Sequence, residues 1–331
     1  MHAAAINLRG GVSPRNTRLR GQSIIEYVLI IAIIGLVIVF AGPGVAGAIR
    51  NQFNLVGNTL NNGTNGGTEG GGASGGGSTG ADSATVQAAI AKDAKDWTLD
   101  EQKAVAEDIA AKGEASPAYA KAKAAMDAGT KFTMKLTNGE TLEYRIIGIN
   151  HDNLADGSGK AGLTFLTSST TISSSMNATD TNVGGWEKSE LRAEMNSGEI
   201  WNLMPADFQS KVKTVRKLTC NVGGYANKDA AVTETADRLF LLSYSEIVET
   251  PKSRWSDYSW IGKEGAQYEA FKGKVTNNDS DNSVIAMGSY WWERSVLPND
   301  SVNFIVVHDS GDPSHNSFAR NWICVCPAWC F

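Results

Sequence analysis

A run of 22 residues without a charged side chain, from Val28 to Ile49, dominates the organisation of this chain. At ~1.5 Å per residue, a helix of this length crosses a bilayer core of about 30 Å. Glu26 lies just before the run, and a carboxylate in such a position is costly in lipid and usually has a function. We therefore expect a long apolar N-terminal helix that enters a membrane.

Charge differs strongly between the two sides of this run. Residues 1–21 carry four arginines and no acid, so the net charge is −9 without them against −5 for all 331 residues. Basic residues beside an apolar run stay on the cytoplasmic side, which predicts that the rest of the chain lies outside the cell. An acidic product also argues against nucleic acid as a partner, because phosphate binding needs a basic surface.

Residues 18–27, with the sequence RLRGQSIIEY, resemble the processing site of Flp-type pilins (type IVb, Tad system). The resemblance implies that a prepilin peptidase cuts after Gly21 and leaves Gln22 as the new N-terminus. Glu26 and Tyr27 would then be the Glu-Tyr pair typical of the Flp branch and would serve assembly with other pilin subunits. Flp pilins are usually much shorter than this chain, which favours a minor or tip subunit.

The residues themselves support a charge-pairing role for Glu26. One helical turn separates it from Gln22, so its carboxylate can pair with the free α-ammonium of the same or a neighbouring subunit, and neither charge is then buried alone. The alternative is an uncleaved signal-anchor with one span and an external domain.

The remaining chain divides into segments by composition. Ten of the twenty residues from 61 to 80 are glycine, which predicts a flexible tether without a core. We therefore expect five parts: a basic leader at 1–21, a pilin-like transmembrane and assembly helix at 22–60, the Gly/Ser-rich linker at 61–80, a helical spacer at 81–129 and an extracellular head at 130–331.

The spacer and head show recognisable local signals. Thr98 and Glu101 form a capping-box pattern at the start of a helix. Asn138-Gly139 lies between two alternating segments, which predicts a β-hairpin. Strand and helix patterns are interspersed without a βαβ repeat, so the predicted fold class is α+β.

A second resemblance covers about 190 residues of the head. Its pattern comprises Gly185-Trp186, the apolar segment 239–243, Trp291 with Arg294, and a closing VCPAW sequence at 325–329. It resembles a bacterial extracellular domain family of unknown function, itself similar to the C-type-lectin-like and formylglycine-generating-enzyme folds. Cys326 stands where that family usually has arginine. The resemblance implies a C-type-lectin-like head and no particular function.

The four cysteines are candidates for disulfides because an exported domain lies where disulfides persist. They are Cys220, Cys324, Cys326 and Cys330, and strand alternation predicts that the last three share one face. Of the three possible pairings, we favour those in which Cys220 bonds Cys324 or Cys326 and the remaining two bond each other. By chain-entropy estimates, closing the long loop is worth about 4 kcal/mol. A four-cysteine zinc site is the alternative.

The sequence shows no catalytic constellation and predicts no enzyme, cofactor or metal site. The acidic turn with His308 and His315 and the segment 277–282 could each gather oxygens around a cation, but a solvated turn is the simpler interpretation. Trp255, Tyr258 and Trp260 lie beside polar residues in a predicted loop and are the candidate ligand-binding surface. Their partner would be a surface glycan or a protein receptor.

These observations predict a pilin-like surface filament subunit, first made as a single-pass membrane precursor, that displays an adhesive head. The alternative is a membrane-anchored sugar-binding receptor or exoenzyme that does not polymerise. Cleavage after Gly21 and the effect of replacing Glu26 distinguish the two.

Overall fold

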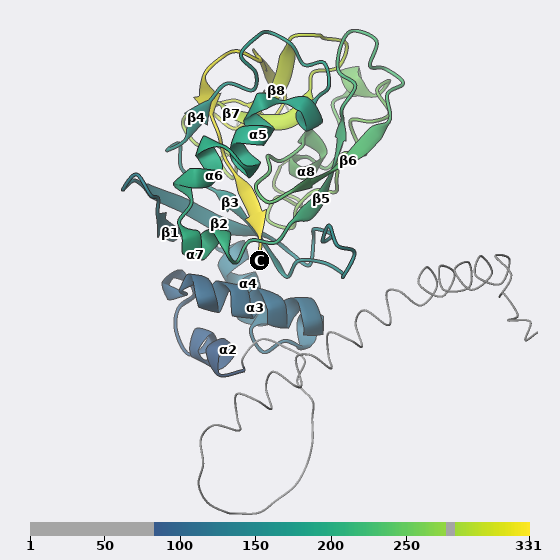
Figure 1. Cartoon of the computed structure of the whole chain (residues 1–331). Coiled ribbons are helices and arrows are strands. Elements are labelled where there is room, and N and C mark those ends of the chain that lie inside the picture. The colour runs from purple at the N-terminus through teal and green to yellow at the C-terminus, as the bar shows by residue number, and fades with distance from the viewer. Residues whose placement is uncertain (1–82, 276–281) are drawn as a thin grey trace, which may run out of the picture. The chain divides into compact units, whose positions relative to one another are not determined.

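The computed structural model describes residues 83–275 and 282–331 (Figure 1). They belong to one compact unit that spans residues 70–331. The predicted processing and assembly residues Gly21, Gln22, Glu26 and Tyr27, together with the linker 61–80, lie outside the described residues.

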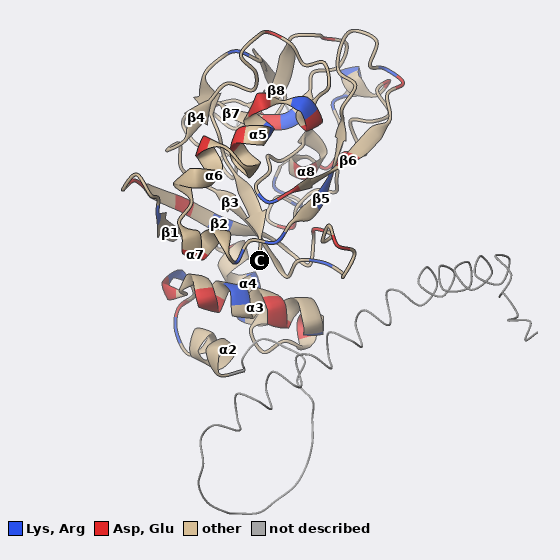
Figure 2. Ribbon diagram, in the orientation of Figure 1, with Lys and Arg blue, Asp and Glu red and all other residues tan. Residues whose placement is uncertain are grey.

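Three helices open the described chain: α2 (Ser83–Ile90), α3 (Leu99–Lys112) and α4 (Tyr119–Asp127). The predicted capping box is confirmed, since the Thr98 side chain accepts from the Glu101 amide and the Glu101 carboxylate accepts from the Thr98 amide. Charges of both signs lie along α3 (Figure 2), where Lys103 pairs with Glu107 one turn later at 2.7 Å. The short 3₁₀ turns η1 (Ala94–Asp96) and η2 (Gly113–Ala115) join the three helices.

These helices, predicted as a helical spacer lying on the head, pack into the folded core. Val105 and Ile109 of α3 are fully buried. The Gln102 side chain donates to the Tyr144 hydroxyl of a neighbouring strand at 3.1 Å. A Cβ atom added at Gly162 would lie 1.8 Å from the carbonyl oxygen of Ala106, so only glycine lets the chain approach α3 this closely.

The first sheet lies next to these helices (Figure 1) and is antiparallel, in the order β1-β2-β3-β11. Its strands are β1 (Phe132–Lys135), β2 (Thr141–Ile149), β3 (Leu163–Thr167) and β11 (Ala328–Cys330). The predicted hairpin is confirmed: β1 pairs with β2, and Gly139 in the turn has a φ of 87°. Phe165 and Trp329 stack across the sheet, with ring centroids 5.9 Å apart.

The second sheet has the order β4-β10-β7-β8-β9, and a separate hairpin joins β5 to β6. The five strands are β4 (Ser173–Ser174), β10 (Ile323–Cys324), β7 (Trp291–Val296), β8 (Asn303–Val307) and β9 (His315–Phe318). The hairpin consists of β5 (Val215–Cys220) and β6 (Val232–Asp237). Short helical segments connect these strands: η3 (Trp186–Lys188), α5 (Glu190–Asn196), α6 (Glu199–Leu203), α7 (Ala206–Gln209), α8 (Tyr244–Ile247) and η4 (Ser253–Trp255).

The last residues contribute one strand to each sheet. β10 pairs in parallel with β7 and β11 pairs antiparallel with β3, so the segment between them crosses from the second sheet to the first. Pro327 lies in this crossing and has no backbone N–H for a continuous ladder. The prediction of a single final strand with three cysteines on one face is therefore wrong.

The predicted fold class is also wrong as a whole. The described unit is a mixed α/β fold with its helices built into it. Within residues 83–275 and 282–331, no helix is both long and apolar enough to span a bilayer. The segment in which the long apolar helix was expected lies outside the described residues.

Glu293 is an unusual residue in the core of the second sheet. It lies in β7, all six residues of which are buried. Within the described part of the chain, neither of its carboxylate oxygens has a hydrogen-bond partner. Burial, and then the nearby charges of Glu264 and Asp312, raise the pKa of Glu293 well above its ordinary value. The surroundings of the side chain therefore favour its neutral, protonated form in the folded protein.

We expect Glu293→Gln to change how stability depends on pH. The unfolded glutamate ionises near pH 4.3, so the folded wild type holds one more proton above that pH. Its free energy of unfolding should then fall by about 1.4 kcal/mol per pH unit until the folded pKa is reached. The variant should lack this contribution. Urea unfolding of both proteins from pH 5 to 9 measures the difference, and the exposed Glu140→Gln is the control. Parallel curves for wild type and Glu293→Gln would contradict the assignment.

Candidate functional site

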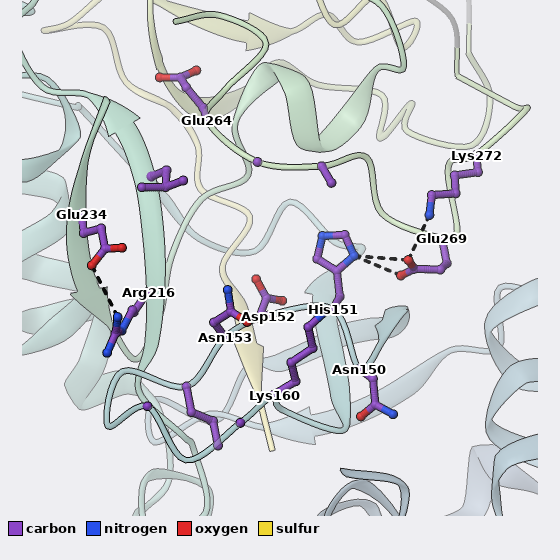
Figure 3. A pocket seen from close by; sticks show the side chains of 16 residues that line it. Asn150, His151, Asp152, Asn153, Lys160, Arg216, Glu234, Glu264, Glu269 and Lys272 are labelled. Carbon is purple, nitrogen blue, oxygen red and sulfur yellow. Dashed lines mark hydrogen bonds and ion pairs between the residues drawn. The ribbon is translucent and has the colours of Figure 1, made fainter. Parts of the chain in front are cut away.

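A polar hollow of about 630 Å³ lies between the loop after β2, the β5–β6 hairpin and the segment 264–272. We call it the central hollow (Figure 3). The labelled lining residues are Asn150, His151, Asp152, Asn153, Lys160, Arg216, Glu234, Glu264, Glu269 and Lys272.

The loop after β2 is shaped by its own backbone. Asn150 has a φ of 50°, a left-handed conformation that asparagine tolerates better than most residues. Its side-chain amide donates to the Ile109 carbonyl of α3 at 3.3 Å, which fixes the start of the loop. The turn further on contains Gly157 and Gly159, whose φ angles of 73° and 135° require glycine. The chain then returns to β3 and closes one wall of the hollow.

Beneath the hollow, a buried lysine joins two carboxylates. The Lys217 ammonium lies 2.6 Å from Asp152 and 2.5 Å from Glu246, and all three side chains are almost completely buried. Burial alone would raise the pKa of Asp152, but Lys217 and then His151 outweigh it and hold that pKa well below its ordinary value. Asp152 also accepts hydrogen bonds from Thr164 at 2.6 Å and Tyr268 at 2.9 Å.

Arg294 extends this buried network toward the second sheet. Its guanidinium lies 2.5 Å from Glu246 and donates to the backbone carbonyls of Leu241 and Glu264. It also donates to the Thr219 hydroxyl at 2.8 Å. Arg294 and Trp291 are both completely buried. Because every charge in the network has a partner, the network holds β2, β5, α8 and β7 in register around the hollow.

The rim of the hollow carries ion pairs that are partly exposed. His151 lies 3.2 Å from Glu269, and its ring stacks on Tyr268 with centroids 4.0 Å apart. Burial raises the pKa of Glu269, but His151 and Lys272 overcome this effect and lower it to about 2. On the opposite side, Arg216 of β5 faces Glu234 of β6 at 3.8 Å.

Glu264 has a pKa suited to an acid–base group, but its carboxylate is not accessible to a ligand. Burial raises its pKa to about 7. However, one carboxylate oxygen accepts from the Cys220 amide at 2.8 Å and the other accepts from the Ser295 hydroxyl. The side chain is completely buried, so it holds β5 to β7 and does not reach a molecule in the hollow.

The aromatic residues that were predicted to form a ligand-binding surface are mostly buried. Trp255 is 5% exposed and Trp260 is completely buried, with its indole N–H donated to the Asn227 carbonyl at 2.7 Å. Tyr258 is only half-buried and packs against the same core. The prediction of an exposed platform at Trp255, Tyr258 and Trp260 is therefore wrong, because these rings fill the interior of a long loop.

None of the predicted disulfides is present. Each cysteine has separate neighbours: Cys324 lies 3.8 Å from Ser173, Cys326 lies 3.3 Å from the Met287 sulfur, and Cys330 lies 3.4 Å from Thr164. Cys220 is buried at the end of β5. The crossing between the two sheets separates Cys324 from Cys330, which explains why strand alternation gave the wrong arrangement.

The histidine turn packs as a small ring cluster. His308 and His315 have ring centroids 4.5 Å apart, and Tyr290 lies 4.5 Å from His308. Across the described ranges, no group of three or more His, Cys, Asp or Glu side chains is placed to hold a metal ion.

Sequence reasoning missed the central hollow. Its charged residues come from segments that span more than 100 positions of the sequence. One signal was available: alternation places Lys217 on the same face of the strand as Val215, which assigns it to the interior. A lysine at such a position needs buried acidic partners.

Comparison with known proteins places the chain in one family. Residues 161–330 match the family described as Domain of unknown function (DUF6273), and the chain belongs to that family. No curated protein and no solved structure matches the chain. The matched region includes Lys217, Glu246, Glu264 and Arg294, whereas His151 and Asp152 precede it.

We expect Lys217→Met to destabilise the fold strongly. The variant keeps the length of the side chain but leaves Asp152 and Glu246 buried without their shared cation, a change that typically costs about 3–5 kcal/mol. Lys228→Met is the matched control, because Lys228 forms an exposed pair with Asp257 and its loss should cost about 0–1 kcal/mol. Urea unfolding at pH 7 measures both, and equal losses would show that the buried network does not stabilise the fold.

Proposed function

We propose that this member of the DUF6273 family is an exported surface protein whose folded unit binds a glycan in the central hollow. The observation that carries the proposal is the hollow itself: about 630 Å³ of space lined by charged and amide side chains from four separate segments. That volume lies within the ~300–1,000 Å³ typical of small-molecule sites.

The lining favours a polar ligand. None of the lining residues is Trp, Tyr or Phe, so affinity must come mainly from hydrogen bonds and charge. Arg216 and Lys272 present donors, while Asn153 offers both donor and acceptor atoms toward the space (Figure 3). A hydroxyl-rich sugar can satisfy such a mixture of donors and acceptors.

The rigidity of the site favours binding over catalysis. Asp152, Glu264 and Glu269 line the hollow, and each already accepts from or pairs with protein groups. A general acid or base needs a proton-transferring atom within reach of the substrate. Carboxylates that are all engaged instead preorganise a binding surface, which reduces the entropy lost when a ligand binds.

The display of this unit at the cell surface is proposed from the sequence. The pilin-like site at residues 18–27 supports cleavage after Gly21 by a prepilin peptidase, and Glu26 with Tyr27 would direct assembly with other pilin subunits. The apolar residues 28–49 support a membrane-inserted precursor. The glycine-rich linker would let the folded unit extend from a fibre as a minor or tip subunit. A membrane-anchored receptor that does not polymerise is the competing function.

Binding in the hollow is tested with Arg216→Gln. We expect at least a tenfold weaker Kd for a glycan identified on an array, because a hydrogen bond to a charged group contributes about 1.5–3 kcal/mol. Lys228→Gln, whose side chain is exposed and lies outside the hollow lining, should bind like the wild type. Unchanged affinity in the folded Arg216→Gln variant would place the ligand elsewhere.

Display is tested by N-terminal sequencing and intact mass of protein sheared from the native cell surface. We expect a chain that begins at Gln22, and we expect Glu26→Ala to reduce incorporation into fibres at least tenfold because the N-terminal ammonium loses its partner. Tyr258→Phe, far along the sequence in the folded unit, is the control for expression. A membrane-bound chain that retains the residues before Gly21 would instead support the non-polymerising receptor.

A further inference from the structure

The central hollow continues into two neighbouring hollows. A second hollow of about 490 Å³, here called the α8 hollow, shares Gly265, Ala266 and Lys272 with it. A third of about 250 Å³, here called the α3 hollow, shares Leu154 and Lys160 with it. Because each neighbour shares lining residues with the central hollow, the three hollows lie next to one another, and we refer to this row as the track.

The length of this track exceeds what one sugar unit needs. The α3 hollow is bounded by Glu107 and Ala110 of α3 and by Lys213, whereas the α8 hollow is bounded by Ser245 and Gln267. A molecule that contacts both ends must be extended, and a linear polymer of similar units fits a row of joined hollows.

Each junction between hollows carries a lysine. Among the described residues, Lys160 has no ion-pair partner, although it lines both the α3 and the central hollow. The side chain of Lys272 is 58% exposed and has one carboxylate partner, Glu269, at 3.2 Å. An ammonium group has three donors and no acceptor, so both junctions can still donate to an anion. Figure 3 shows that the two lysines come from different segments.

The carboxylates along the track are mostly neutralised by the protein. Glu107 pairs with Lys103 and Lys213, Glu234 faces Arg216, and Glu269 pairs with Lys272. Among the described residues, Glu249 at the α8 end forms no ion pair, although Lys272 lines the same hollow. Anionic groups of a ligand are therefore expected at the two lysine junctions and not at that end.

We infer that the ligand is a linear glycan that carries carboxylates, such as a uronic-acid polymer, lying across all three hollows with carboxylates at Lys160 and Lys272. This inference rests on the proposed glycan-binding function and specifies its ligand class. Among the described residues, no Trp, Tyr or Phe ring lines the central hollow, so a sugar cannot stack on such a ring there. Charge-assisted hydrogen bonds between lysines and the carboxylates of a charged glycan can replace that stacking.

The test measures binding of oligosaccharides to the full chain. Three kinds are used, each from one to eight units long: oligomers of galacturonate, oligomers that contain glucuronate, and oligomers of mannuronate and guluronate. Their methyl esters have the same backbone without charge. Calorimetry should show at least a tenfold tighter Kd for six units than for one, and at least a tenfold loss on esterification. Lys160→Gln combined with Lys272→Gln should reduce the affinity for six units to that for one. Lys228→Gln should bind six units with the same Kd as the wild type. Thermal unfolding verifies that each variant is folded.

Different failures distinguish the two proposals. Arg216-dependent binding that does not change with length would overturn the polymer inference and leave the glycan site in the central hollow. Equal binding of acids and esters would overturn the role of the ligand carboxylates. If no glycan binds, neutral or acidic, both the inference and the proposed function are wrong.

Discussion

The pairing of Lys217 with Asp152 and Glu246 is the interaction on which the described structure depends. Lys217 lies in β5, Asp152 in the loop after β2 and Glu246 in α8, so one ammonium group connects three regions that are distant in sequence. A buried pair of this kind gives little net stability compared with apolar packing, but its separation would leave charges in the interior. The network therefore favours one arrangement of these segments and discriminates against shifted ones.

This constraint also explains the character of the surface above it. Asp152 and Glu264 line the central hollow but are held from below, by Lys217 and by the Cys220 amide respectively. The exposed charges of the site are those of the rim, which include Arg216 and Lys272. A rigid buried layer under an exposed charged rim is suited to recognising the pattern of polar groups on a ligand.

The helices and the final strands show that a local sequence pattern does not determine what an element packs against. The residues of α3 look sparse in apolar content, yet alanines there allow the close contact with Gly162 that joins the helix to the first sheet. The final segment alternates like one strand but divides at Pro327 between two sheets. The apolar segment 239–243 is buried, yet it forms only an isolated bridge at Phe240 before α8 begins. In each case, the local pattern did not identify the packing partner.

Local chemistry in the sequence determined the features with short-range causes. The capping box at Thr98 and the hairpin at Asn138-Gly139 could be predicted, because each depends only on neighbouring residues. The fold class, the incorporation of the helices into the core, the separate environments of the four cysteines and the burial of Trp255 and Trp260 could not. Neither could the central hollow, whose residues meet only when β2, the β5–β6 hairpin and the segment 264–272 come together. Tertiary structure decided these features because they depend on long-range pairing of charges and sheets, which no local pattern encodes.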